Sequence, residues 1–207
     1  MTDSIQIASN FISALDLFGI AVFAASGALA AARQGQTLVT FAFFALTTGV
    51  GGGTVRDLLI GAPVFWVHDW AFPATCLATA LLVWVTPSRV WNDRALEWFD
   101  AVGLAVYAVF GAWKALSLGI GPLPAMMMGV ITACVGGIIR DLLAGEPSIL
   151  LKPEIYVTAA ALASGLYVAL AWVGLPVPVA GAISAVAGFT LRALAIHRGW
   201  GIPAYQR

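Results

Sequence analysis

Two Arg–Asp pairs lie inside apolar stretches of this sequence, and each follows a run of glycines. The first stretch, TGVGGGTVRDLLIGAP, starts at Thr48 and contains Arg56 and Asp57. The second, TACVGGIIRDLLAGEP, starts at Thr132 and contains the pair Arg140–Asp141. Charged residues are rare in membrane-spanning segments, where they pair with one another or mark the path of a solute. These residues could therefore form buried ion pairs or help to move a charged solute.

A stripe of polar and small residues precedes the second Arg–Asp pair. Its members recur at steps of three and four residues and so share one helix face: Asp100, Gly103, Tyr107, Gly111 and Lys114. The corresponding stripe near the N-terminus is Asp16, Gly19, Phe23, Gly27 and Ala30. Lys114 could act as a tethered cation at the mouth of a solute path. Alternatively, its side chain extends to the membrane–water interface.

Each stripe carries an aspartate at the depth expected for one of the arginines. Asp16 matches Arg56, and Asp100 matches Arg140, so we expect one ion pair in each half of the chain. These pairs could be purely structural, or they could take part directly in selectivity or gating, together with Asp57 and Asp141.

The glycine runs predict interruptions of two helices. Glycine weakens a helix interior and frees backbone groups, which are tolerated at membrane depth only beside protein or water. A broken helix end would present carbonyl oxygens to a partly dehydrated cation. The alternative is close helix packing through small residues. The candidate path residues are Thr48, Gly49, Gly51, Gly52, Gly53, Thr132, Gly136 and Gly137, together with Tyr107 and Lys114 of the second stripe.

The elements that must position these residues are seven membrane-spanning helices. The chain has 207 residues, of which 61% are hydrophobic and 10% charged. Soluble proteins carry about 25% charged residues, and one span needs about 20 apolar residues. The expected spans are Phe11–Ala32, Thr37–Ile60, Trp70–Val85, Trp98–Ser117, Leu123–Ala144, Ile155–Val173 and Val177–Ala195.

An internal repeat organises these spans. Residues 15–63 align without a gap with residues 99–147, at an offset of 84 residues, and 18 of 49 positions are identical. We therefore expect a first three-helix unit over residues 11–85, a linker over 86–97, a second unit over 98–173, and a seventh helix with its tail over 174–207. Because each unit holds an odd number of spans, the second enters the membrane from the opposite side. This inverted repeat is an architecture of solute-moving proteins.

The basic residues of the loops predict the orientation. All of them fall on one side: Arg33, Arg89, Arg94, Lys152, Arg192, Arg198 and Arg207. The positive-inside rule places this side, with the C-terminus, in the cytoplasm and the N-terminus outside. The chain is therefore expected in the cell inner membrane, in contact with lipid.

Several other classes of function are disfavoured. The only histidines, His68 and His197, lie outside the spans, and no Ser–His or metal-ligand spacing occurs, so we expect neither an enzyme nor a metal centre. Apart from a transported potassium or sodium ion, no cofactor is expected. The zero net charge gives no basis for nucleic-acid binding. Cys76 and Cys134 lie in apolar runs and are expected to be core residues.

The doubled glycine–Arg–Asp–Leu–Leu motif and the two stripes resemble the trimeric intracellular cation (TRIC) channel family, in its prokaryotic branch. The resemblance covers about residues 15–195. It implies a homotrimer with one pore per subunit, formed around kinked second and fifth helices, that conducts monovalent cations, mainly potassium. The same class of sequences has also been labelled a glycine transporter. The alternative function is therefore a secondary carrier of a small solute such as glycine.

Overall fold

The computed structural model describes residues 2–91, 94–151 and 154–203, with side chains from residue 16 onward. These residues form seven α-helices and three short 3-10 turns. In chain order they are α1 (Thr2–Arg33), α2 (Leu38–Leu59), η1 (Phe65–Val67), α3 (Ala71–Val85), η2 (Ser88–Val90), α4 (Ala95–Ser117), α5 (Pro122–Leu143), η3 (Ile149–Leu151), α6 (Val157–Trp172) and α7 (Val177–Arg198).

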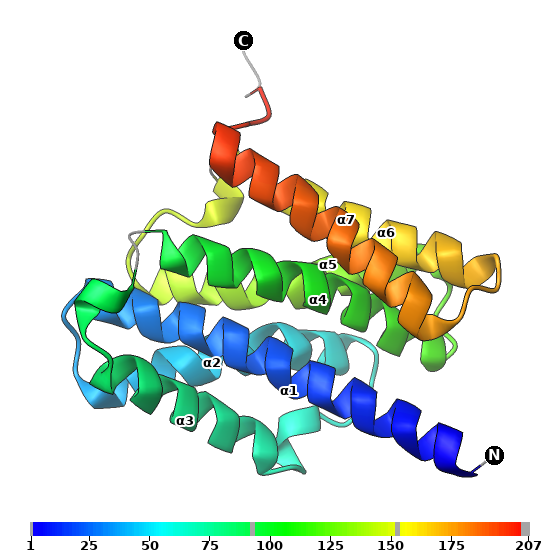
Figure 1. The fold of residues 1–207 in the computed structure, drawn as a ribbon, viewed down its shortest axis with the longest axis horizontal. Coiled ribbons are helices and arrows are strands. Elements are labelled where there is room, and N and C mark those ends of the chain that lie inside the picture. The colour runs from blue at the N-terminus through cyan, green and yellow to red at the C-terminus, as the bar shows by residue number, and fades with distance from the viewer. Residues whose placement is uncertain (1, 92–93, 152–153, 204–207) are drawn as a thin grey trace.

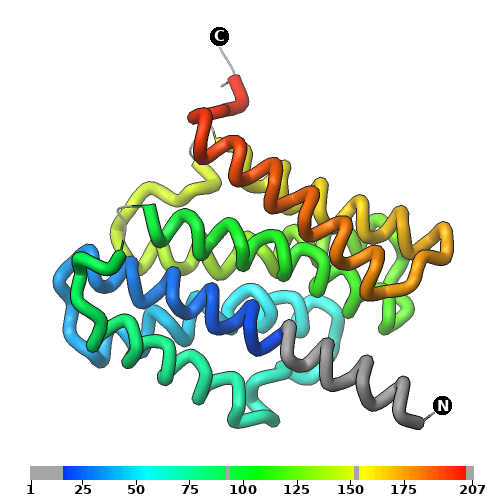
Figure 2. Tube along the Cα trace, viewed as in Figure 1, coloured from blue at the N-terminus to red at the C-terminus, as the bar shows by residue number. Residues whose placement is uncertain are grey.

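The helices form two three-helix units that lie side by side (Figure 1). In the first unit α3 packs against both α1 and α2, and in the second α6 packs against both α4 and α5. The units meet where α1 contacts α4 and where α2 contacts α5. The last helix, α7, packs on α6 and α4, so it adds to the second unit alone, as the path of the chain in Figure 2 shows.

In the part of the chain that the structure describes, five helices are long and apolar enough to cross a membrane. They are α2, α4, α5, α7 and the part of α1 from Asp16 to Arg33. The two remaining helices, α3 and α6, are apolar but have only 15 and 16 residues. They occupy corresponding places in the two units, and α3 is preceded by the short turn η1. The predicted all-helical membrane architecture with seven helices is confirmed.

The ends of α2 and α5 share one local structure that follows from the repeated sequence. Gly61 and Gly145 adopt left-handed backbone conformations, with φ of 67° and 66°. The residue after each glycine donates its N–H back to the carbonyl oxygen of Asp57 or Asp141, at 2.9 and 3.0 Å. Only glycine adopts this conformation without strain, and the bonds satisfy carbonyls that the helix end leaves open. Both Arg–Asp pairs therefore lie in the last turn of a helix, and both helices end in the same glycine motif.

The predicted interruption of the second and fifth helices is wrong. Both α2 and α5 are continuous over their full 22 residues. Their glycines instead allow the two helices to touch: a Cβ added at Gly52 would overlap with the carbonyl oxygen of Thr132, and one added at Gly136 would overlap with that of Thr48. The closeness of the backbones offsets the roughly 1 kcal/mol by which glycine weakens a helix relative to alanine.

This crossing also reveals the pseudo-two-fold relation between the units. Gly136 and Thr132 are the repeat equivalents of Gly52 and Thr48, 84 residues further along the chain. The Gly52–Thr132 and Gly136–Thr48 contacts are therefore equivalent. A second such pair joins α1 to α4: Gly19 faces the ring of Tyr107, and Gly103 faces the ring of Phe23. Because exchanged contacts occur in both directions, the units are related by a two-fold operation, as the inverted repeat requires.

Candidate functional site

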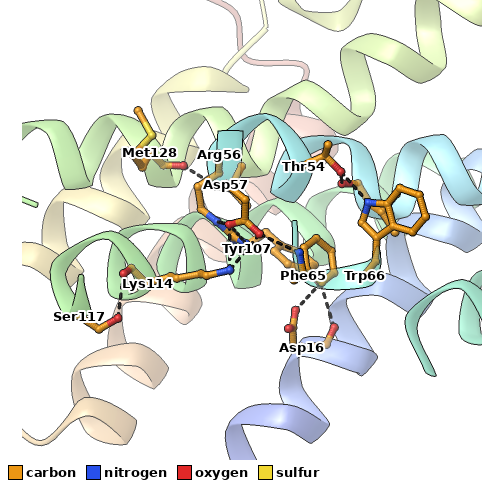
Figure 3. A network of polar contacts seen from close by, with 12 residues as sticks. Asp16, Thr54, Arg56, Asp57, Phe65, Trp66, Tyr107, Lys114, Ser117 and Met128 are labelled. Atoms are coloured by element: carbon orange, nitrogen blue, oxygen red, sulfur yellow. Dashed lines mark hydrogen bonds and ion pairs between the residues drawn. The ribbon is translucent and has the colours of Figure 1, made fainter. Parts of the chain in front are cut away.

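The side chain of Asp57, at the end of α2, is fully buried and collects several donors (Figure 3). Arg56 donates its Nε–H to Asp57 Oδ1 at 2.8 Å. Lys114, which reaches across from α4, donates from Nζ to both carboxylate oxygens, at 2.8 and 3.0 Å. The backbone N–H of Phe65 donates to Oδ2 at 3.1 Å. One carboxylate thus holds two cationic side chains and one peptide group.

Arg56 is nearly inaccessible, at 1% exposure, and it lies between two aromatic rings. Its guanidinium carbon is 5.5 Å from the ring centroid of Phe110 and 5.8 Å from that of Phe65. Its Nη1 group is buried, and none of the described residues accepts a hydrogen bond from it. Cation–π contacts and a single carboxylate therefore hold this charge, which leaves Arg56 more weakly satisfied than a buried arginine usually is.

The predicted Asp16–Arg56 ion pair is wrong. The hydroxyl of Tyr107 donates to Asp16 Oδ1 at 2.8 Å and lies 2.9 Å from the Asp16 carbonyl oxygen. Arg56 turns to its own neighbour, Asp57, at 2.8 Å. The repeat explains the difference, because the position equivalent to Tyr107 in the first unit is Phe23, which has no hydroxyl to offer Asp100.

The second unit places Arg140 between two carboxylates. Its Nη1 donates to Asp100 Oδ1 at 2.6 Å, so the expected Asp100–Arg140 pair is present. Its Nε and Nη2 donate to Asp141 Oδ1 at 2.9 and 2.8 Å. Ser26 of α1 accepts a further hydrogen bond from Nη1. Asp141 also accepts the backbone N–H of Ile149 at 2.8 Å, which mirrors the Asp57–Phe65 contact of the first unit.

The two clusters therefore differ in charge although they share a backbone framework. Among the described residues, the first has two cationic groups for the carboxylates of Asp16 and Asp57, while the second has Arg140 for both Asp100 and Asp141. The extra cation is Lys114, whose equivalent in the first unit is Ala30. Counted over these described side chains, the first cluster is formally neutral and the second has an excess of one negative charge, which favours cations.

The threonines of the candidate path lie at the crossing between the two clusters. Both are buried: Thr132 donates its hydroxyl to the Met128 carbonyl oxygen at 2.5 Å, whereas the Thr48 hydroxyl has no partner among the described residues. Their backbone carbonyls pack against glycines of the facing helix. The remaining glycines of the runs face side chains, since Gly51 meets Ile139 and Gly49 meets Cys76. Thr48 and Thr132 thus lie at the same helix crossing, each against a glycine of the facing helix, and neither helix has an open backbone end there.

Gly53 and Gly137 each leave room for an aromatic side chain beside the charge cluster of their unit. A Cβ at Gly53 would lie 2.6 Å from the Phe65 ring, and one at Gly137 would lie 2.7 Å from the Tyr156 hydroxyl. These glycines are therefore needed for the close approach of an aromatic side chain to each arginine.

Sequence reasoning missed several members of the clusters. Ser26 and Phe110, which contact Arg140 and Arg56, occupy equivalent positions of the repeat, so alignment of the two stripes could have identified them. Outside the two clusters, Glu154 pairs with Arg192 of α7 at 2.8 Å. Arg192 is buried and no single sequence feature distinguished it from the other basic residues of its side.

Within the described residues, no three histidine, cysteine, aspartate or glutamate side chains are close enough to hold a metal ion. Cys76 and Cys134 are buried and not disulfide-bonded. The chemistry available to the clusters is therefore electrostatic: carboxylates that can attract a cation, and a lysine that competes for one of them.

Comparison with known proteins places the repeat in a wider context. A family model described as "Glycine transporter" matches residues 13–88 and again residues 97–172. Relatives include a UPF0126 membrane protein of Vibrio cholerae, 44% identical over 73% of this chain and 64% of the relative. The UPF0126 inner membrane protein YadS of Escherichia coli K12 is 39% identical over 92% of this chain and 94% of its own length.

Two solved structures share the fold over nearly the whole chain. The TRIC trimeric intracellular cation channel orthologue from Rhodobacter sphaeroides has a TM-score of 0.85 and 43% sequence identity, covering 92% of this chain and 99% of its own. A structure described as the basis for conductance through TRIC cation channels has a TM-score of 0.84 and 30% identity, covering 94% and 97%. The likeness therefore includes both units and the seventh helix.

Proposed function

We propose that this chain, which belongs to the trimeric intracellular cation (TRIC) channel family, is itself a channel for monovalent cations, with potassium as its main ion. The path would run within one chain, between α1, α2, α4 and α5. It would pass from the Asp16–Asp57 cluster, along the crossing of α2 and α5, to the Asp100–Asp141 cluster.

The observation that carries this proposal is the position of Lys114. Its ammonium group is bonded to both oxygens of a fully buried carboxylate, yet its side chain remains 21% exposed. A tethered ammonium group there occupies the place that a partly dehydrated potassium ion would take. Since Lys has a long flexible stem and no equivalent in the other unit, it can leave Asp57 without disturbing the framework. We infer that the structure represents a closed path in which Lys114 competes with the conducted ion.

The negative excess at the second cluster supports cation preference. Asp100 and Asp141 share one arginine, and their carboxylates accept hydrogen bonds from Arg140 and a backbone amide. A cation that reaches this end meets a net attraction, whereas an anion meets repulsion. In this proposal the Asp100–Asp141 cluster selects cations at one end of the path, and Lys114 gates the path at the other end.

The assembly and its placement in the cell extend the same proposal. The similar Rhodobacter sphaeroides protein is a trimeric channel, which supports a homotrimer with one path per subunit. The Escherichia coli relative is an inner membrane protein, which supports the cell inner membrane for this chain. By the positive-inside rule, the basic loop residues support a C-terminus in the cytoplasm and an N-terminus outside.

Orientation has a direct test. Cysteines introduced at Leu175, in the α6–α7 turn, and at Ser88, in η2, should be labelled by a membrane-impermeant maleimide from opposite sides. In intact cells we expect labelling of the Leu175→Cys variant only, because the proposed orientation places Ser88 in the cytoplasm. The native Cys76 and Cys134 are buried and provide a low background. Labelling of Ser88→Cys in intact cells would contradict the orientation.

A second function rests on the family description "Glycine transporter". A carrier would use the same inverted repeat but would have to enclose its solute and alternate between two closed states. The flux measurement below distinguishes the two functions, since a carrier that lost Lys114 would not pass potassium down its gradient.

The proposal predicts that Lys114→Gln raises potassium flux severalfold. The amide keeps much of the side-chain volume but removes the charge that competes for Asp57. Potassium release from proteoliposomes, driven by a potassium gradient with a counter-ion pathway, provides the measurement. Lys114→Arg is the matched control: it retains the positive charge and should keep flux at the wild-type level. Equal flux in the Gln, Arg and wild-type proteins would exclude Lys114 as the competing cation.

A further inference from the structure

The seventh helix, which lies outside the inverted repeat, contributes a buried cation to the second unit. Arg192 of α7 is 1% exposed, and its guanidinium carbon lies 5.3 Å from the ring centroid of Tyr156, the residue before α6. Its Nη2 donates to the Glu154 carboxylate at 2.8 Å, and its Nη1 donates to the Ile155 carbonyl oxygen at 3.3 Å. Arg192 thus holds three consecutive residues of the segment that leads into α6.

The other end of the Tyr156 side chain reaches the second charge cluster. Tyr156 is 1% exposed, and Gly137 of α5 leaves room for its hydroxyl: a Cβ there would lie 2.7 Å from Tyr156 Oη and 3.1 Å from Asp100 Oδ1. The hydroxyl interacts electrostatically with the Asp100 carboxylate, yet among the described residues neither the hydroxyl nor Asp100 Oδ2 has a hydrogen bond of regular geometry. A buried donor and a buried acceptor in one cluster are unfavourable unless they bond to each other.

The first unit contains a hydrogen bond of the kind that this open pair could form. There the Tyr107 hydroxyl donates at 2.8 Å to Asp16, the repeat equivalent of Asp100. A symmetric copy of that bond in the second unit would need a hydroxyl at Phe23, which has none. Tyr156 brings a phenol to Asp100 from a position that is not equivalent to Tyr107. Each unit therefore has one phenol for its aspartate, and only the second phenol is held by α7.

We propose that Arg192 is a positioning residue for the Asp100–Asp141 cluster: it holds the ring of Tyr156 so that the hydroxyl donates to Asp100 Oδ2. A hydrogen bond from this hydroxyl offsets part of the charge on the carboxylate, so α7 sets how strongly the cluster attracts a cation. The effect on conduction rests on the proposed function, whereas the positioning itself does not require a channel.

Melting temperatures in detergent micelles test the positioning independently of transport. Tyr156→Phe keeps the ring on Arg192 but removes the hydroxyl, and it should lower the melting temperature by about 5 °C. The loss should be smaller in an Asp100→Asn background, since a bond to a neutral amide is about half as strong as one to a carboxylate. In an Arg192→Gln background this non-additivity should disappear, because the ring is no longer held. Arg192→Gln should still fold, since the side chain of Glu154 is 37% exposed and reaches water.

Tyr167→Phe and Arg198→Gln are the matched controls. Tyr167 is a buried tyrosine within α6, outside both charge clusters, so its substitution should have the same effect with and without Asp100→Asn. Arg198 also lies on α7 and stacks on an aromatic ring, at 5.1 Å from the centroid, but it is exposed. Arg198→Gln should therefore keep the non-additivity. Additive effects of Tyr156→Phe and Asp100→Asn would overturn the proposal, as would non-additivity that persists without the Arg192 guanidinium.

Unitary currents test the consequence for conduction. Tyr156→Phe and Arg192→Gln should each lower the half-saturating potassium concentration of the unitary conductance severalfold, because Asp100 then binds a cation more tightly. The double variant should lower it no further than Tyr156→Phe alone. A loss of active channels with an unchanged half-saturating concentration would indicate a purely structural role and overturn the proposal. If the melting results hold but the wild-type protein gives no unitary currents, the channel function is rejected and the positioning by α7 stands.

Discussion

Leucine at Gly52 should prevent the two units from packing together. A Cβ at this position would overlap with the backbone carbonyl oxygen of Thr132, and a backbone atom in the middle of α5 cannot move aside as a flexible side chain would. Overpacking a core commonly destabilises a protein by about 1–3 kcal/mol and sometimes more. Because the leucine would meet backbone atoms, we expect a destabilisation at or above the upper end of this range. We expect aggregated protein or a much lower melting temperature, and we expect the same from Gly136→Leu, its counterpart by pseudo-symmetry.

Alanine at Gly52 makes the test sharper, because helix propensity and packing have opposite signs. Propensity alone would stabilise α2 by about 1 kcal/mol, whereas the overlap with Thr132 should destabilise the fold. We expect a lower melting temperature. Gly181→Ala of α7 is the control, since its Cβ would meet Val109 at 3.6 Å, an ordinary contact. Wild-type stability of Gly52→Ala would mean that α2 and α5 do not cross closely.

Removal of the Arg140 side-chain charge should be the most damaging of the electrostatic changes. Arg140→Gln leaves the carboxylate of Asp100, which is 1% exposed, and that of Asp141 without their shared cation. Breaking a buried pair in this way costs about 3–5 kcal/mol. Reversible denaturation in mixed micelles measures the cost. The exposed Arg89→Gln should change stability by less than about 0.5 kcal/mol.

A double-mutant cycle separates the pair from its surroundings. Asp100→Asn alone leaves Arg140 with Asp141 and should cost less than Arg140→Gln. In the Asp100→Asn, Arg140→Gln double variant, part of the loss should be recovered, because no uncompensated charge remains at Asp100. Additive costs would show that the two residues do not interact, contrary to the 2.6 Å separation of Arg140 Nη1 and Asp100 Oδ1.

The helical membrane architecture could be predicted well because it depends on features that can be read directly from the sequence. Apolar length determines the spans, and the offset of 84 residues determines which helices correspond. The Asp100–Arg140 pair was also foreseeable, since inversion of the repeat places both residues toward the same side of the membrane. Depth in the membrane follows from counting residues along a helix.

The details that sequence could not predict depend on which way side chains turn and what faces them. The glycine runs are compatible with a broken helix or a close crossing, and only the position of α5 against Gly52 decides between them. Asp16 and Arg56 do not pair, because the Tyr107 hydroxyl donates a hydrogen bond to Asp16 and Arg56 bonds to the adjacent Asp57. One hydroxyl and one lysine in α4 thus change the pairing while the backbone repeat is kept.

Current recorded from the purified protein in a planar bilayer tests the central proposal most directly. With unequal potassium concentrations across the bilayer, a cation channel should give discrete unitary steps that reverse near the potassium equilibrium potential, and Lys114→Gln should increase their amplitude or frequency. The opposite result would be an absence of unitary steps in wild type and variant alike, together with slow, saturable uptake of glycine into liposomes. That combination would contradict a channel and identify the chain as a carrier.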